Sequence, residues 1–276
     1  MAITAQDVNK LRQMTGAGMM DCKKALTEAE GDFEKAVDIL RKKGQKVSAS
    51  RADRETKEGV VVTRVAENGT KGILLSLTCE TDFVAKNEGF VEFANTLIDL
   101  AAANAAASKD AVLALPIENI TVAEKIIEMT GRIGEKIDIS HYEIITGEAV
   151  IPYIHSNGKL GVLVGLTNTS GSDVEEAGKD VAMQIAAMNP VAVDKDGVDS
   201  STVEREIEIG KEQARAEGKA EEMLEKIALG KLAKFYKENT LLSQQFVKDN
   251  SKSIAQYLDG VSKGLTVNAF KRISIG

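Results

Sequence analysis

Residues 65–77 read VAENGTKGILLSL, and residues 154–166 read IHSNGKLGVLVGL. In each stretch an Asn-Gly pair stands between two runs of β-forming residues, and a tight hairpin turn needs the positive φ that Asn and Gly tolerate. Each stretch therefore predicts a β-hairpin. Ala-rich helical patterns follow at 90–107 and 176–188, and the two Asn-Gly pairs lie 89 residues apart. The repeat predicts two related halves, each built from a hairpin and a helix.

The first 45 residues follow a helical period instead. Thr4 and Asp7 form a capping-box pair, and Gly16, Gly31 and Gly44 stand where runs of helically spaced apolar residues stop. The pattern predicts a small bundle of three short helices, with Gly44 ending the third.

Residues 203–238 have a wide charged face, a narrow apolar face and a break near Gly218. Together with a capping-box pattern at Ser201 and Glu204, they predict an antiparallel helical hairpin, which could pair with itself or pack on the rest of the chain. The fold class is thus α+β. We predict a three-helix module at 1–45, a linker at 46–58 that could continue as a solvated helix, a first core half at 59–146, a second half at 147–190 and 239–276, and a helical insert at 191–238.

Charge is unevenly distributed along the sequence. The 276 residues carry a formal net charge of −7, yet residues 1–54 hold eleven Lys and Arg against eight Asp and Glu. An acidic body lacks the basic surface that phosphates require, and Trp is absent, which argues against base-stacking platforms. We therefore expect no direct contact with nucleic acid.

The chain has no signal for membrane insertion or secretion. No apolar run reaches the ~18 residues that a membrane helix needs, and the N-terminus lacks a secretory pattern. The two cysteines, Cys22 and Cys79, do not form a disulfide framework. These features predict a cytoplasmic protein without a membrane partner.

Catalytic and metal-binding patterns are missing too. The two histidines, His141 and His155, lack metal-ligand spacing, and TGAGMMDCKK (15–24) lacks the spacing of a phosphate-binding loop. Cys79 lies beside Glu80 and Asp82, which disfavour a reactive thiolate. We expect no enzyme activity, no catalytic residue, no metal and no cofactor.

The stretch CETDFVAKN (79–87) follows a smooth apolar strand. Taken from the residues alone, it predicts a helix start in which Thr81 or Asp82 is the cap and Phe83 packs inward. Met19 and Met20 raise a separate question, because a small bundle cannot easily bury both. They are either core residues or an exposed docking patch, since methionine adapts well to protein contacts.

Two long stretches resemble the signature sequences of the bacterial elongation factor Ts family: LRQMTGAGMMDCKKAL (11–26) and LTCETDFVAKN (77–87). The resemblance extends through RIGEKI (132–137), YIHSNGKLGVLV (153–164) and AMQIAAMNP (182–190). It implies an N-terminal ubiquitin-associated-like three-helix module, two related α+β subdomains and an inserted helical hairpin used in dimerisation. Longer members of the family continue past the last strand into a tail helix that contacts their partner protein, elongation factor Tu. This sequence ends at KRISIG (271–276).

The resemblance also implies a function. Members of the family promote nucleotide exchange on elongation factor Tu, and the Asp-Phe pair of their TDFV motif intrudes beside the partner's switch II and Mg²⁺ site. Matching positions here give the Mg²⁺-dislocation residues Thr81, Asp82, Phe83 and Val84, and the further partner-binding residues Met19, Met20, Lys23, Ile133, Gly134 and His155.

The expected partner is thus elongation factor Tu, with a possible homodimer through the helical insert. The alternative is a chaperone or binding module that holds nascent chains without exchange activity, since a three-helix bundle on an α+β body would suit that role too.

Overall fold

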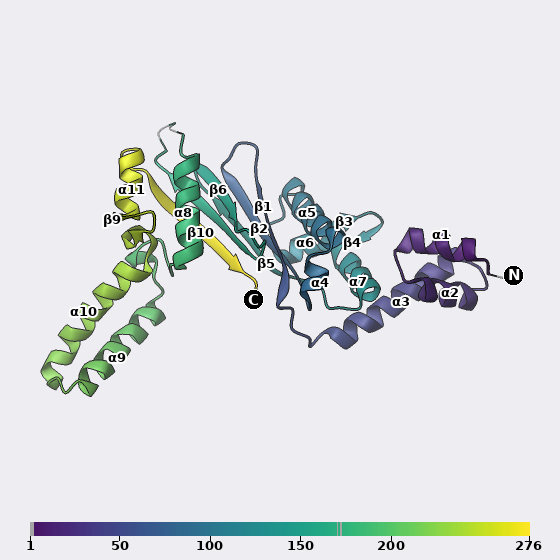
Figure 1. Ribbon diagram of the computed structural model, residues 1–276, viewed down its shortest axis with the longest axis horizontal. Helices are drawn as coiled ribbons and strands as arrows, with labels where there is room; N and C mark the ends of the chain where they lie inside the picture. Colours follow the sequence, from purple (N-terminus) through teal and green to yellow (C-terminus); the bar gives the residue numbers. More distant parts are fainter. Residues whose placement is uncertain (1–2, 170, 172) are drawn as a thin grey trace. The chain divides into compact units, whose positions relative to one another are not determined.

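The computed structural model describes residues 3–169, 171 and 173–276 (Figure 1). The chain divides into two compact units. Unit 1 contains the residues up to Val62 together with Leu75–Tyr142 and Ser274–Gly276, and unit 2 contains Thr63–Leu74 and Glu143–Ile273.

The helices of unit 1 begin with a bundle that has its own apolar core, which includes Leu11, Cys22 and Leu26. The Thr4–Asp7 capping box is present, and Gly16 ends the first helix in the left-handed conformation, both as predicted. The helices of this unit are α1 (Ala5–Thr15), α2 (Met19–Glu28), α3 (Phe33–Arg51), α4 (Asp82–Ala85), α5 (Glu88–Ala103), α6 (Lys109–Ala114) and α7 (Val122–Ile133).

The prediction that Gly44 ends the third helix is wrong. Helix α3 passes through Gly44 and ends at Arg51, so residues 46–51 of the predicted linker form the solvated helical continuation that the sequence left open. The glycine allows close packing rather than a turn, because a Cβ added to Gly131 of α7 would lie 2.5 Å from the Cα of Gly44. A glycine at a helix crossing and a glycine at a helix end look alike in sequence.

The domain boundaries predicted from the sequence stay predictions.

Both predicted hairpins are present, and each gains a third strand. The sheets have the orders β1-β2-β5 and β10-β7-β6, so the third strand lies beside the second strand of the hairpin in both. Strands β6 and β7 pair antiparallel, with Val150 opposite Gly165. This shared order is what two related halves predict. The strands are β1 (Glu58–Val65), β2 (Lys71–Cys79), β5 (Asp138–Thr146), β6 (Ala149–Ile154), β7 (Leu160–Thr167) and β10 (Thr266–Ser274), with short pairs β3 (Pro116–Ile117) and β4 (Ile120–Thr121), and β8 (Gln245–Phe246) and β9 (Asp249–Ser253).

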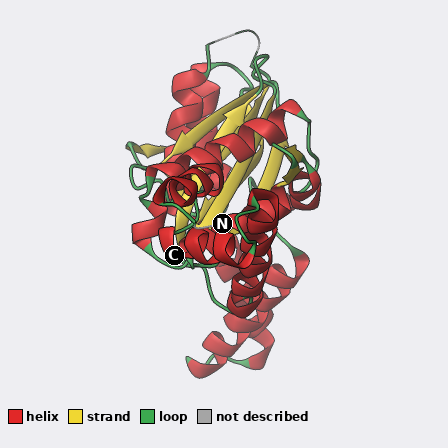
Figure 2. Cartoon of the chain, turned by 90° about the vertical axis from the view of Figure 1, so that its right-hand side faces the viewer, coloured by secondary structure: helices red, strands yellow, loops and turns green. Residues whose placement is uncertain are grey.

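In unit 2, helix α8 (Glu175–Met188) packs against β6 and β7, and its inner face shares a core with α11 (Ile254–Val261). The insert forms the predicted antiparallel pair, α9 (Ser200–Ala216) and α10 (Glu221–Asn239), with Gly218 at φ 75° between them. Figures 1 and 2 show this pair extending away from the strands of its unit.

The apolar seam of the insert is internal. Gly210 and Ala214 of α9 are buried, as are Leu224, Ala228 and Leu232 of α10. The two helices therefore pack on each other along this seam, as the predicted antiparallel hairpin requires. The second predicted capping box is wrong: Asp199 caps α9 by accepting a hydrogen bond from the Ser201 N–H. An aspartate two positions before Ser201 caps the helix instead.

Candidate functional site

The 81–84 turn, Thr81–Val84, stands at the end of an almost completely buried strand. Every residue of β2 after Lys71 is buried, up to Cys79. The four-residue helix α4 starts at Asp82, and α5 starts after Asn87, whose side chain accepts a hydrogen bond from the Gly89 N–H. The turn is thus fixed to a strand on one side and to a long helix on the other.

Phe83 does not pack inward, which corrects the prediction made from the residues alone. Its side chain is 84% exposed. A helix of four residues has room for only one inward position, and Ala85 occupies it, while Phe90 of α5 is buried in the core. A large aromatic side chain is instead held out in solvent, where it gains no burial energy.

Thr81 occupies the N-cap position of α4, yet its side chain makes no capping hydrogen bond. It turns to Glu135 instead. The Thr81 N–H donates to Glu135 Oε2 at 3.0 Å, and the Thr81 hydroxyl donates to Oε1 at 2.6 Å. One carboxylate therefore satisfies both donors of the residue that precedes Asp82, and charge-assisted bonds of this kind are stronger than neutral ones.

Glu80 mirrors this contact. Its Oε1 accepts the Lys136 N–H at 2.8 Å, and Arg51 of α3 lies 3.1 Å from its Oε2. Segments 79–81 and 134–136 thus each donate a backbone N–H to a carboxylate of the other. These contacts restrain the base of the 81–84 turn.

Asp82 and Lys86 form an ion pair one helical turn apart, with Asp82 Oδ2 2.7 Å from Lys86 Nζ. The hydrogen bond to the Asp82 carboxylate raises the pKa of Lys86 above its ordinary value. The pair is solvent-exposed, and such pairs contribute little to stability. The Asp82 carboxylate therefore remains near the surface, next to Phe83, where a partner can reach it.

The Cys79 thiol lies beneath the turn. It donates to the Thr81 carbonyl at 3.2 Å. Burial, assisted by the negative charge of Glu135, raises the pKa of Cys79 to about 12. Since the thiolate is the reactive form, this cysteine is an inert structural residue, as the sequence predicted.

Ile133 and Gly134 directly precede Glu135, whose carboxylate contacts the 81–84 turn at Thr81. Gly134 ends α7 with φ 84° and donates its N–H to the Thr130 carbonyl. A left-handed residue at this position favours glycine and directs the chain toward Glu135. Ile133 is half-buried. The structure therefore brings these two residues together with Thr81.

Met19, Met20 and Lys23 are all exposed on α2. The two methionine side chains are 45% and 64% exposed, so neither is a core residue. Helix α2 packs on α1 and α3, whereas α4 packs on α5. These residues and the 81–84 turn therefore lie on separate elements of unit 1, and the elements between them are α3 and α7.

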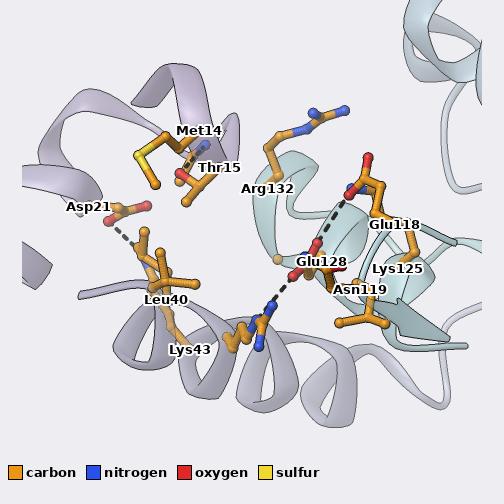
Figure 3. Close-up of a pocket in the computed structure, with 16 residues that line it drawn as sticks. Met14, Thr15, Asp21, Leu40, Lys43, Glu118, Asn119, Lys125, Glu128 and Arg132 are labelled. Atoms are coloured by element: carbon orange, nitrogen blue, oxygen red, sulfur yellow. Dashed lines mark hydrogen bonds and ion pairs between the residues drawn. The ribbon is translucent and has the colours of Figure 1, made fainter. Parts of the chain in front are cut away.

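A cavity of about 310 Å³ lies where the three-helix bundle meets α7 (Figure 3). Met14 and Leu40 line its apolar part. Ion pairs border it, including Arg41 with Glu128 at 3.3 Å and Lys43 with Asp21. Together with the Gly44–Gly131 contact, the Arg41–Glu128 pair attaches α3 of the bundle to α7, whereas the Lys43–Asp21 pair joins α3 to α2 within the bundle.

His155 belongs to unit 2 and is exposed at the mouth of the β6–β7 hairpin. Its Nδ1 lies 2.9 Å from the Tyr153 hydroxyl. Within the described ranges, no group of three or more His, Cys, Asp or Glu residues is arranged to hold a metal ion. No helix among the described residues is long and apolar enough to cross a membrane.

No sequence pattern predicts a role for Glu135. It lies within RIGEKI (132–137), where the family resemblance points only to its neighbours Ile133 and Gly134. Its partner Thr81 is 54 residues away, and no periodic pattern reports a contact over that separation. The only available signal was the charge itself, directly after a glycine that ends a helix.

Comparison with known proteins gives a consistent result. A family model described as Elongation factor TS matches residues 80–276. The chain is 64% identical to the Elongation factor Ts of Cytophaga hutchinsonii, with 99% of both chains covered. It is 55% identical to the Elongation factor Ts of Amoebophilus asiaticus over the full length of both, and 52% identical to that of Christiangramia forsetii over 99% of each.

Proposed function

Because the chain belongs to the elongation factor Ts family, a family of translation elongation factors, we propose that it binds elongation factor Tu and promotes the exchange of GDP for GTP. The observation that carries the proposal is Phe83, a large aromatic side chain 84% exposed on a restrained turn. An aromatic side chain held in solvent gains no burial energy within the monomer, and aromatic residues are enriched at protein interfaces.

The proposed action of the 81–84 turn is steric. Phe83 inserts beside switch II of elongation factor Tu and shifts the element that carries the water ligands of the partner's Mg²⁺. Loss of Mg²⁺ leaves the phosphate charge of GDP uncompensated, so that GDP dissociates. A stiff side chain on a restrained turn suits this role, because a mobile one would yield instead of displacing its neighbour.

Asp82 has a supporting role in this proposal. Its carboxylate competes for polar groups around the Mg²⁺ site or holds the displaced element. In the free protein that carboxylate pairs with Lys86, so binding exchanges one exposed ion pair for contacts with the partner. The exchange costs little, because exposed pairs contribute only about 0–1 kcal/mol.

Other exposed residues complete the proposed docking surface. Met19, Met20 and Lys23 on α2 contact the nucleotide-binding domain of elongation factor Tu. Three residues of the two α+β subdomains, Ile133, Gly134 and His155, add contacts to the same partner. The chain itself makes and breaks no covalent bond. We also propose a homodimer through the helical insert. It would use the exposed faces of α9 and α10, because their apolar seam is already used within the hairpin.

Linkage sets the order of events. A factor that weakens GDP binding to its partner is itself weakened by GDP to the same degree. The protein therefore binds nucleotide-free elongation factor Tu most tightly and is released when GTP binds.

The test follows the release of fluorescent GDP from elongation factor Tu in excess unlabelled GDP. Substoichiometric wild-type protein should accelerate release, and Phe83→Ala should lower the acceleration by at least about tenfold. Val261→Ala, which truncates an exposed apolar residue on α11, is the matched control and should behave as wild type. Binding without acceleration by the wild-type protein would support the alternative of a binding or chaperone module.

A further inference from the structure

A carboxylate outside the 81–84 turn holds the residue from which the turn starts. Glu135 accepts both the N–H and the hydroxyl of Thr81, at 3.0 and 2.6 Å. The two acceptor oxygens lie on one planar group, so the contact restrains the orientation of Thr81 as well as its position. Because Thr81 precedes Asp82 directly, its backbone orientation sets the direction in which α4 begins.

The 81–84 turn has few other restraints of its own. Helix α4 has four residues, and Thr81 gives it no side-chain cap. Helices of this length are not stable without tertiary contacts. Only Ala85 of α4 is buried, so packing alone leaves the direction of Phe83 weakly determined.

Glu135 itself stands on a firm base. It follows Gly134, the left-handed C-cap of the twelve-residue helix α7. The next residue, Lys136, donates its N–H to Glu80 and its ammonium group to the carbonyls of Ala52 and Arg54, at 2.6 and 3.0 Å. The carboxylate is thus presented by a segment that is fixed on both sides.

We propose that Glu135 is a positioning residue for nucleotide exchange, which holds Thr81 so that Phe83 projects in the direction required to enter the partner. This inference rests on the proposed function, because it assigns Glu135 an effect only through Phe83. Glu135 therefore affects the maximal exchange rate. It does not affect docking, because the proposed docking residues Met19 and Met20 lie on α2, away from the 81–84 turn.

The chain offers a matched control for such a contact. In unit 2, Glu148 Oε2 accepts the Thr169 N–H at 2.9 Å and the Thr169 hydroxyl at 3.1 Å. A glutamate again accepts from both donors of a threonine, although here through one oxygen, while Glu148 Oε1 accepts the Thr167 hydroxyl at 3.1 Å. The residue after Thr169 in the sequence is Ser170, which is not aromatic. Glu148→Ala therefore removes an equivalent contact away from the 81–84 turn.

The first experiment measures exchange on elongation factor Tu over a range of its concentrations. Glu135→Ala should lower the maximal rate by about tenfold with a nearly unchanged half-saturating concentration, because a displaced group loses rate while docking persists. Glu135→Gln should restore most of the rate, since its amide can accept from the N–H and donate to the hydroxyl oxygen of Thr81. Thr81→Val, a milder change, should give an intermediate loss, and Glu148→Ala should match wild type.

A double-mutant cycle tests whether Glu135 acts through Phe83. In a Phe83→Ala background, Glu135→Ala should cause no further loss of rate. A second loss of similar size would overturn the proposal, because Glu135 would then act independently of Phe83. Wild-type rates for both Glu135→Ala and Thr81→Val would overturn it as well.

A second measurement does not depend on exchange. The sequence contains no Trp, so Phe83→Trp introduces a single fluorescent probe at the turn. Anisotropy decay should show added nanosecond motion of this probe when Glu135→Ala is combined with it, and none with Glu148→Ala. If the wild-type protein does not accelerate exchange, the proposed function fails; if it does and Phe83→Ala exchanges normally while this added motion is seen, the role of Phe83 fails and the Glu135 contact is only structural. If Phe83→Ala is defective and Glu135→Ala adds no motion, only the positioning role fails.

Discussion

The segments that follow β2 and β7 both contain a threonine bound by a glutamate, but they differ in the residues after that threonine. Each of the two strands is the buried middle strand of a three-stranded sheet, and each is followed by a threonine whose N–H and hydroxyl both donate to a glutamate. After β2 the chain forms α4 and exposes Phe83, whereas after β7 the sequence continues from Thr169 with Ser170, Gly171 and Ser172, none of which has a large apolar side chain. The two units thus share a way of ending a strand, and unit 1 adds an aromatic residue to it.

This difference separates structural from functional features. The glutamate–threonine contact occurs in both units, so it belongs to the scaffold and does not by itself indicate a partner site. The sequence NTSGSD (168–173) after β7 contains no aromatic counterpart of Phe83, and the exposure of Phe83 contributes nothing to folding. The comparison therefore identifies the exposed aromatic residue, rather than the turn in general, as the feature that needs a functional explanation.

The largest expected effect tests whether the two strands are equally important to the core. Leu77 of β2 and Leu166 of β7 are both fully buried. Leu77→Ala and Leu166→Ala should each lower the free energy of unfolding by about 2–5 kcal/mol, since truncation leaves a cavity. Urea denaturation measures both. A loss of less than about 1 kcal/mol at either site would show that the two strand ends are not comparable scaffolds.

The next effect tests how the helices pack in each unit. A Cβ on Gly131 would meet backbone at Gly44, while one on Gly178 of α8 would overlap the side chain of Ile151. Gly131→Ala and Gly178→Ala should each cost about 1–3 kcal/mol, because the Gly44 Cα and the Ile151 Cβ, 2.5 and 2.9 Å from the added atoms, are both fixed to the backbone and cannot rotate away. Gly230→Ala, where nothing lies within 4 Å, is the control and should be neutral or slightly stabilising. Equal costs at all three sites would exclude the close-packing explanation.

A smaller effect concerns the thiol beneath the 81–84 turn, since burial raises the pKa of Cys79 from 9.0 to about 12. The folded protein therefore keeps this proton when the unfolded chain has lost it. The contribution of the protonated thiol is fully present below about pH 9 and is lost as the pH rises toward about 12. Between about pH 8 and pH 10, wild type should lose about 1 kcal/mol more stability than Cys79→Ala. Parallel pH profiles for the two proteins would argue that the thiol titrates normally.

The smallest effect on stability is expected at Phe83. Because its side chain is 84% exposed, Phe83→Ala should change the free energy of unfolding by no more than about 0.5 kcal/mol, even though its effect on exchange should be large. A buried phenylalanine would instead cost about 3–5 kcal/mol. A loss in that range would show that Phe83 packs in solution, and the contrast between the two strand ends would disappear.

Local sequence pattern was sufficient to predict most of the helices and strands. The Asn-Gly pairs placed both hairpins, and the spacing of apolar residues placed α7 at Val122–Ile133 and separated α9 from α10 near Gly218. It was not sufficient where a residue serves a distant neighbour. From the residues alone, Gly44 was interpreted as a helix end and Phe83 as a core residue, because packing partners far along the chain do not influence local periodicity; the family resemblance instead assigned Phe83 to partner binding.

The sequence by itself determined the α+β class, the two hairpins, the helical insert and, through its signature stretches, the family. Those features depend on φ preferences, on period and on residue identity, all of which are local. Only the tertiary structure decided that Phe83 faces solvent, that Gly44 and Gly131 meet, and that Glu135 holds Thr81. Each of these depends on contacts between segments separated by 54 or more residues or on the limited space in the core, and no local pattern encodes either.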